Sequence, residues 1–240
     1  MPMLFVRYLK ILLALTIVGF VPVTQATMAE VPDKVLFVGN SFTFYNNGIH
    51  THYRNLVRSA RPDDASKGRV RIMTMSGARL PEHRAALKSV LDSEPWDVVV
   101  LQGHSRGPIE EVTAAAFRDA ARHYAGAIRE HGAEPVFFMT WAYADAPGMT
   151  EKLESAYGAI AGELDARVVP VGLAFAQATR ERPDINLFAD DKQHPSLAGS
   201  YLAACMFYAA LRGASPEGID YDAGLDPEVA RYLQRLAWQW

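Results

Sequence analysis

Three side chains of the types that cooperate in nucleophilic catalysis lie near opposite ends of this sequence. Ser41 follows an apolar run at 35–38 and a Gly-Asn pair, while Asp191 and His194 share a polar loop near the carboxyl terminus. A serine hydroxyl needs a base, usually histidine, and the base needs a third group that fixes its tautomer. The D-x-x-H spacing lets Asp191 fold back toward Nδ1 of His194, which leaves Nε2 free for Ser41. Together they form a candidate Ser41–His194–Asp191 triad.

The position of Ser41 in the chain favours this interpretation. A short apolar run that ends in Gly39 is typical of a strand buried on both faces, as in a parallel sheet. Ligands of open α/β sheets bind beyond the carboxyl ends of the strands. The alternative is that Asn40 and Ser41 only cap the following helix. The other histidines lie on or beside predicted helices, where a solvated or satisfied ring is the usual outcome: His50, His52, His83, His123 and His131, with His104 in a loop.

Strand and helix patterns alternate about five times along the chain. Apolar runs predict strands at 35–38, 70–75, 96–101, 135–139 and 168–171, and helical spacing predicts helices at 49–60, 80–91, 109–131, 150–164, 196–211 and 227–240. Such alternation implies an α/β fold: a parallel five-stranded sheet with helices on both faces, in three α/β/α layers. Pro170 weakens the fifth strand toward an edge.

Composition and charge exclude several classes of protein. The 240 residues are 50% hydrophobic and 21% charged, with a net charge of −3, which is ordinary for a globular protein and gives no electrostatic footprint for nucleic acid. The single cysteine, Cys205, excludes an internal disulfide and a cysteine-based zinc site.

The amino terminus has the pattern of a secretory signal peptide. Arg7 and Lys10 precede the apolar run 11–21, and small residues follow. We expect residues 1–29 to be a signal peptide cleaved after Ala26 or Ala29, and residues 30–240 to form a single catalytic domain. The mature protein is then exported, periplasmic or secreted, with no stable membrane span; the alternative is an uncleaved anchor, for which the run is short.

With these elements in place, the chain resembles the SGNH (GDSL-like) hydrolase superfamily. The resemblance rests on Gly39-Asn40-Ser41 near the amino terminus, Gly77 after the second strand, and D-x-x-H before a late P-S-x-x-G-S-Y-L-A-A stretch. It implies a flavodoxin-like sheet, Ser41 as nucleophile, His194 as base and Asp191 as acid. It also implies oxyanion donors at the backbone N–H groups of Ser41 and Gly77.

One block departs from the superfamily pattern. In the superfamily, the third of the shared sequence blocks is commonly G-x-N-D, and its asparagine side chain donates a hydrogen bond to the oxyanion. This chain has Gly103-His104-Ser105 at that place. Gln102 or Ser105 is the candidate for that donor.

The same block creates a rival motif. Residues 103–107 read G-x-S-x-G, the nucleophile-elbow signature of α/β-hydrolases, which would make Ser105 the nucleophile with the same His194. Too few strands precede it, Gly107 and Pro108 delay the next helix, and no His-Gly-Gly segment lies upstream.

The predicted reaction is hydrolysis of a carboxylic ester, of an acetylated carbohydrate, a lipid or a small ester, through an acyl-enzyme. It needs no cofactor and no metal. The alternative of a metal site at Asp190, Asp191, His194 and His104 has no close His-x-His or H-E-x-x-H spacing to support it. Candidate substrate-binding residues are Phe42, Arg79 and Trp141. A non-enzymatic alternative is an exported binding module on a degenerate hydrolase scaffold.

Overall fold

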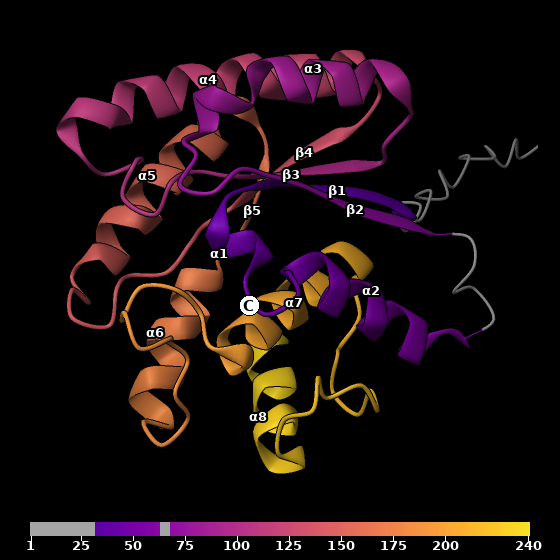
Figure 1. Cartoon of the computed structure of the whole chain (residues 1–240), viewed down its shortest axis with the longest axis vertical. Coiled ribbons are helices and arrows are strands. Elements are labelled where there is room, and N and C mark those ends of the chain that lie inside the picture. The colour runs from indigo at the N-terminus through magenta and orange to yellow at the C-terminus, as the bar shows by residue number, and fades with distance from the viewer. Residues whose placement is uncertain (1–31, 63–67) are drawn as a thin grey trace, which may run out of the picture. The chain divides into compact units, whose positions relative to one another are not determined.

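The computed structural model describes residues 32–62 and 68–240, and its central element is the parallel sheet (Figure 1). The strands lie in the order β2-β1-β3-β4-β5, and each neighbouring pair is parallel. Their bounds are β1 (Lys34–Gly39), β2 (Arg69–Thr74), β3 (Val98–Gln102), β4 (Glu134–Phe138) and β5 (Arg167–Val169). This is the 2-1-3-4-5 order of flavodoxin-like folds, and it confirms the predicted fold class.

The strand order fixes where a crevice forms. The chain moves outward from β1 to β2 and then crosses to β3 on the other side of β1, so connections leave in opposite directions at the carboxyl ends of β1 and β3. Ligands bind at such a switch point. The loops that follow β1 and β3 carry Ser41 and Ser105, so both candidate nucleophiles lie at this edge of the sheet.

Helices cover both faces of the sheet, as Figure 1 shows. On one face lie α3 and α4, with α5 beside them, and on the other lie α1, α2, α6, α7 and α8. The helices are α1 (Ser41–Phe44), α2 (Ile49–Ala60), α3 (Arg84–Ser93), α4 (Glu111–Glu130), α5 (Met149–Leu164), α6 (Val171–Glu181), α7 (Leu197–Arg212) and α8 (Pro227–Ala237).

Alternation along the buried strands divides the core between these two faces. Val35 and Phe37 pack with α2 and α7, whereas Leu36 and Val38 pack with α3, α4 and α5. Successive side chains of a strand point to opposite faces, so a strand covered on both sides is apolar throughout. Both faces of β1 are therefore fixed by packing, which holds the position of the chain that follows Gly39.

The predicted elements differ from the observed ones mainly at their ends. The predicted helix at 80–91 begins as a 3₁₀ turn, Leu80–His83, and becomes α3 only at Arg84. Pro81 lacks a backbone N–H and lies at the first turn, where that donor has no helical partner. The fifth strand is an edge strand, as predicted, but it ends at Val169, before Pro170, whereas the prediction extended it to residue 171.

The predicted signal peptide, 1–29, lies outside the described residues. Among the residues that the structure describes, no helix is both long and apolar enough to cross a membrane.

Candidate active site

The turn after β1 makes Asn40 a helix cap and leaves Ser41 at the first position of α1. The side-chain oxygen of Asn40 accepts a hydrogen bond from the backbone N–H of Phe42 at 3.1 Å, as an N-cap residue does. Asn40 therefore takes the capping role that was the alternative interpretation of this motif. The side chain of Ser41 makes no capping bond, and 9% of this residue's surface is exposed at the carboxyl end of β1.

The loop before α7 is folded around the Asp191 carboxylate. Its Oδ1 accepts the backbone N–H groups of Gln193 at 3.0 Å and His194 at 2.9 Å, and its Oδ2 accepts Nδ1–H of His194. Desolvation acts to raise the pKa of Asp191, but the hydrogen bonds from the side chain of His194 and from the two backbone amides outweigh it and lower this pKa to about 2. Asp191 is therefore ionised over the whole neutral range, and it fixes the tautomer of His194.

His194 joins this loop to the turn after β1. Its Nε2 lies 2.8 Å from the Oγ of Ser41, although the two residues are 153 positions apart in the chain. In a neutral ring with Nδ1–H bonded to Asp191, the lone pair of Nε2 faces the hydroxyl of Ser41. The structure thus brings Ser41, His194 and Asp191 together in one hydrogen-bonded line.

Aromatic rings hold the imidazole in this position. Tyr45 stacks on the ring of His194 with centroids 4.1 Å apart and planes within 10°, and Phe42 meets the ring edge-on at 5.4 Å. Behind Phe42, Trp141 stacks between Phe42 at 4.7 Å and Phe175 at 4.3 Å. These contacts restrict rotation of the ring out of reach of Ser41.

Two of the three predicted substrate-binding residues are buried instead. Trp141 has no exposed surface and Phe42 is 4% exposed, so neither lines an open crevice. The indole Nε1–H of Trp141 donates to the backbone oxygen of Gln193 at 2.9 Å, next to His194. Their aromatic character predicted a pocket, but their stacking makes them a support for the loop 190–195, which carries Asp191 and His194 and is called the histidine loop below.

The backbone amides of Ser41 and Gly77 lie at the ends of neighbouring strands β1 and β2. Gly77 has φ +67°, in the left-handed region that favours glycine, and a Cβ there would meet open space. Neither amide forms a backbone hydrogen bond in the described parts of the chain. Both N–H groups are thus available to a ligand oxygen.

The side chain of Gln102 is fully engaged in bonds within the protein. Its amide donates to the side-chain oxygen of Asn40 at 2.8 Å and to the backbone oxygen of Gly103 at 2.6 Å. An amide nitrogen has two hydrogens, so none remains for a substrate. Of the two candidates for the third oxyanion donor, Gln102 therefore has no hydrogen left to donate.

Ser105 lies in the loop after β3 and is bonded to a tyrosine. Its Oγ is 2.8 Å from the hydroxyl of Tyr143, and 5% of the residue is exposed. The hydrogen-bond partner of His194 Nε2 is Ser41 and not Ser105. If Tyr143 donates in this pair, the hydroxyl hydrogen of Ser105 stays free to donate elsewhere.

Of the cavities in the described part of the chain, two border the loops of the candidate site. One of about 110 Å³ is lined by Arg79, Pro81, His104 and Phe117, among others, and one of about 310 Å³ is lined by Tyr143, Ala144, Phe175 and Phe188, among others. The N–H of Ala144 donates to Lys192 of the histidine loop at 2.9 Å, which places the larger cavity beside that loop. Arg79 is the predicted substrate-binding residue that does line a cavity.

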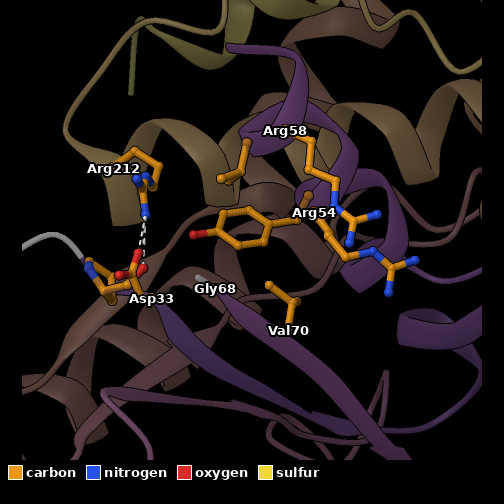
Figure 2. A pocket seen from close by; sticks show the side chains of 9 residues that line it. Asp33, Arg54, Arg58, Gly68, Val70 and Arg212 are labelled. Carbon is orange, nitrogen blue, oxygen red and sulfur yellow. Dashed lines mark hydrogen bonds and ion pairs between the residues drawn. The ribbon is translucent and has the colours of Figure 1, made fainter. Parts of the chain in front are cut away.

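A third cavity lies at the opposite, amino end of the strands, shown in Figure 2. In it Asp33, which precedes β1, pairs with Arg212 at 3.5 Å, while the side chains of Arg54 and Arg58 extend to the other side (Figure 2). Its volume of about 20 Å³ holds roughly one water molecule. It is too small for an organic substrate.

The residues weighed for a metal site are not gathered into one. In the described ranges, no group of three or more His, Cys, Asp or Glu side chains is placed to hold a metal ion. Asp191 and His194 are engaged with each other and with Ser41.

No protein-family model and no curated protein matches the chain. Solved structures do match. A candidate SGNH hydrolase from Slackia heliotrinireducens is 28% identical with a TM-score of 0.62, and the match covers 75% of this chain and 98% of that one. A DUF4886 family protein from Bacteroides uniformis is 19% identical with a TM-score of 0.66, covering 86% and 93%.

An acetylxylan esterase from Geobacillus stearothermophilus is also similar in fold. It is 15% identical with a TM-score of 0.61, and the match covers 77% of this chain and 95% of that one. At such identity the likeness concerns the fold. The resemblance predicted from Gly39-Asn40-Ser41, Gly77 and Asp191-x-x-His194 is confirmed: the chain is a hydrolase of the SGNH (GDSL-like) superfamily.

Proposed function

We propose that this protein hydrolyses carboxylic esters through a covalent acyl-enzyme formed on Ser41. One observation carries the proposal: Nε2 of His194 is 2.8 Å from Oγ of Ser41, while Nδ1 is bonded to Asp191. A nucleophile, a base and an orienting carboxylate in hydrogen-bonding distance are what acyl transfer to serine requires.

In the first half-reaction, His194 takes the hydroxyl proton as Oγ of Ser41 attacks the ester carbonyl carbon. The imidazolium that forms is stabilised by the Asp191 carboxylate, which stays ionised because its pKa is about 2. His194 then gives the proton to the leaving alcohol oxygen as the tetrahedral intermediate collapses. In the second half-reaction, His194 takes a proton from water, which attacks the acyl-enzyme carbonyl, and then returns the proton to Oγ of Ser41 as the carboxylic acid leaves.

The negative charge on the intermediate needs hydrogen-bond donors that are already in place. We assign this role to the N–H groups of Ser41 and Gly77, which have no backbone acceptor in the described residues. Ser105 is our candidate for a third donor, since Tyr143 can donate to its oxygen and leave its hydrogen free. Gln102 is not a donor in this mechanism.

For the substrate, we favour an acetylated carbohydrate over a lipid ester. The similar fold of an acetylxylan esterase supports this choice. The cavity of about 310 Å³ that Tyr143, Phe175 and Phe188 line beside the histidine loop also supports it, since this volume is within the range of pockets for small organic ligands.

The rival nucleophile Ser105 is not favoured, because its hydroxyl partner is Tyr143. The binding-module alternative is not favoured either, because an intact serine, histidine and aspartate in line serve no purpose in ligand binding alone.

We further propose that the protein is exported, on the signal-peptide pattern of residues 1–29. Expression in a bacterial host followed by amino-terminal sequencing tests this. A periplasmic or secreted product that begins after Ala26 or Ala29 is expected, and a full-length cytoplasmic product contradicts export.

The experiment that tests the activity is a panel of acetyl, butyryl and long-chain esters, with acetylated xylooligosaccharides, assayed on wild type and Ser41→Ala. We expect the highest kcat/KM on acetyl esters. Ser41→Ala should lose about 10⁴–10⁶ in kcat, as when a serine hydrolase loses its nucleophile. Unchanged activity in Ser41→Ala would refute the assignment, and preference for long-chain esters would refute the substrate class alone.

A further inference from the structure

The amide of Gln102 lies at the centre of a buried hydrogen-bond network that joins three catalytic segments. Its Oε1 accepts the backbone N–H of Asn40 at 3.0 Å and the hydroxyl of Thr43 at 2.6 Å. Its Nε2 donates to the side chain of Asn40 and to Gly103 O. Gln102, Asn40 and Thr43 are each at most 2% exposed. Both lone pairs of the amide oxygen and both hydrogens of the amide nitrogen are thus used in bonds within the protein.

Asn40 extends this network to the loop that holds Gly77. Its Nδ2 donates to the backbone oxygen of Ala78 at 3.0 Å, while its Oδ1 accepts from Phe42 N–H and from Gln102. A single asparagine side chain therefore ties the turn of Ser41 to the residue after Gly77. Gln102 fixes the orientation of that side chain, because it occupies the oxygen and leaves the nitrogen facing Ala78.

Gly39 shows how closely the network is fitted. A Cβ at this position would overlap Oε1 of Gln102 and lie 2.6 Å from Oγ1 of Thr43. The backbone of β1 and the Gln102 amide are therefore in contact at the point where the strand ends. The glycine of the Gly39-Asn40-Ser41 motif leaves room for the glutamine of β3.

We propose that Gln102 is a positioning residue that sets the distance between the two backbone oxyanion donors, Ser41 N–H and Gly77 N–H. It acts through Asn40 and Thr43 and does not touch the substrate. This inference rests on the proposed function. It assigns the last residue of β3 a different task from the oxyanion asparagine that the superfamily keeps in the following block.

The chain contains a matched control for this idea. Gln234 of α8 is also 1% exposed and also bonded on both sides, accepting from Gly218 N–H and donating to Tyr201 and Ile219 O. It lies in α8, outside the network of Asn40, Thr43 and Gln102. Replacing either glutamine by methionine removes similar buried hydrogen bonds with little change of volume, so a purely structural role predicts similar effects.

The test compares Gln102→Met with Gln234→Met in the full chain. Both should lower the denaturation midpoint, because each leaves buried donors unpaired. Only Gln102→Met should lower kcat, by about 10²-fold, the cost of losing or displacing an oxyanion donor. KM should change by less than about threefold, and the shape of the pH profile should stay that of wild type, because the His194–Asp191 pair is untouched.

Thr43 supplies a second, milder test in case Gln102→Met does not fold. Thr43→Val removes one bond to Gln102 and should lower kcat about tenfold, whereas Thr43→Ser keeps the hydroxyl and should restore it. In the double variant Gln102→Met/Thr43→Val, the loss should be no larger than in Gln102→Met alone, because both act through one network.

The inference is overturned if Gln102→Met and Gln234→Met have equal kcat, or if Thr43→Val has the kcat of wild type. Its failure is distinct from failure of the proposed function. The latter would appear as a wild-type protein that neither hydrolyses esters nor reacts with a fluorophosphonate at Ser41.

Discussion

The loops that follow β1 and β3 both place a serine at the carboxyl edge of the sheet, but only one of them meets a histidine. Ser41 is 2.8 Å from Nε2 of His194, and Ser105 is 2.8 Å from the hydroxyl of Tyr143. Both serines are nearly buried, at 9% and 5% exposure. Position at the switch point therefore does not distinguish the two serines; the hydrogen-bond partner of each one does.

The two loops also differ in how the chain leaves the strand. After β1, Asn40 caps α1 at once, so Ser41 is the first helical residue. After β3, the chain runs through 103–110 before α4 begins at Glu111. A nucleophile elbow needs a sharp strand-to-helix turn, which the G-x-S-x-G stretch does not form here. The sequence at 103–107 therefore matches the motif but does not have the backbone geometry of a nucleophile elbow.

The largest expected effect that separates the loops comes from their histidines. His194→Gln should lower kcat by about 10⁴–10⁶, because Ser41 loses its base. His104→Gln, in the loop after β3, should change kcat by less than about fivefold, since His104 has no bond to either serine. Steady-state kinetics on an acetyl ester measures both. Comparable losses in the two variants would break the distinction between the loops.

Asp191→Asn serves as the companion variant within the histidine loop. The amide keeps acceptance of the backbone N–H groups but no longer stabilises the imidazolium, so a loss of about 10³–10⁴ in kcat is expected with little loss of stability. Wild-type kcat in this variant would show that Asp191 only shapes the loop.

A smaller effect is expected from Ser105, and it sharpens the comparison. If Ser105 is an oxyanion donor, Ser105→Ala should lower kcat by about 10²–10³. If Ser105 were the nucleophile, the same variant would lower kcat by about 10⁴ or more. If Ser105 were only structural, kcat would change by almost nothing. Kinetics of Ser105→Ala beside Ser41→Ala, under the same conditions, separates the three roles by magnitude.

Tyr143→Phe should have a weaker effect than Ser105→Ala. It removes the hydroxyl that holds Ser105 and should lower kcat about tenfold, the equivalent of roughly one hydrogen bond. A loss larger than that of Ser105→Ala would mean that Tyr143 itself contacts the reacting atoms.

The smallest expected effect concerns pH. Desolvation, and after it the charge of Arg79, lowers the pKa of His104 below its usual 6.5, so its imidazole is uncharged above pH 6.5. Asp191, with a pKa of about 2, does not change charge between pH 4 and 9 either. The profiles of kcat/KM against pH for wild type and His104→Gln should therefore superimpose from about pH 6.5 to 9. An additional limb that disappears in His104→Gln would place His104 in the reaction.

The sequence predicted correctly the features that depend on a short stretch of chain. The apolar run into Gly39 predicted the buried strand and the position of Ser41, and the spacing of Asp191 and His194 predicted the fold-back of the carboxylate. Both depend on short-range backbone geometry. The parallel sheet followed in the same way from alternation of strand and helix patterns.

What the sequence could not supply were contacts between distant polar groups. Gln102 ends an otherwise apolar strand, which signals a buried polar role, but only the fold shows that both of its amide hydrogens are used. Trp141 and Phe42 were predicted to bind substrate because they are aromatic residues near the edge, and they are stacked together inside the core. Burial of a side chain depends on elements 100 positions away, which no local pattern records.

The central claim, that Ser41 and not Ser105 is the nucleophile, is tested most directly by identifying the labelled residue. The protein is incubated with a fluorophosphonate and digested, and the modified peptide is sequenced by mass spectrometry, with heat-denatured protein as the control for non-specific reaction. We predict one phosphonylated peptide, modified at Ser41, and none in the Ser41→Ala or denatured samples. Modification at Ser105, or no modification of the native protein, would contradict the account.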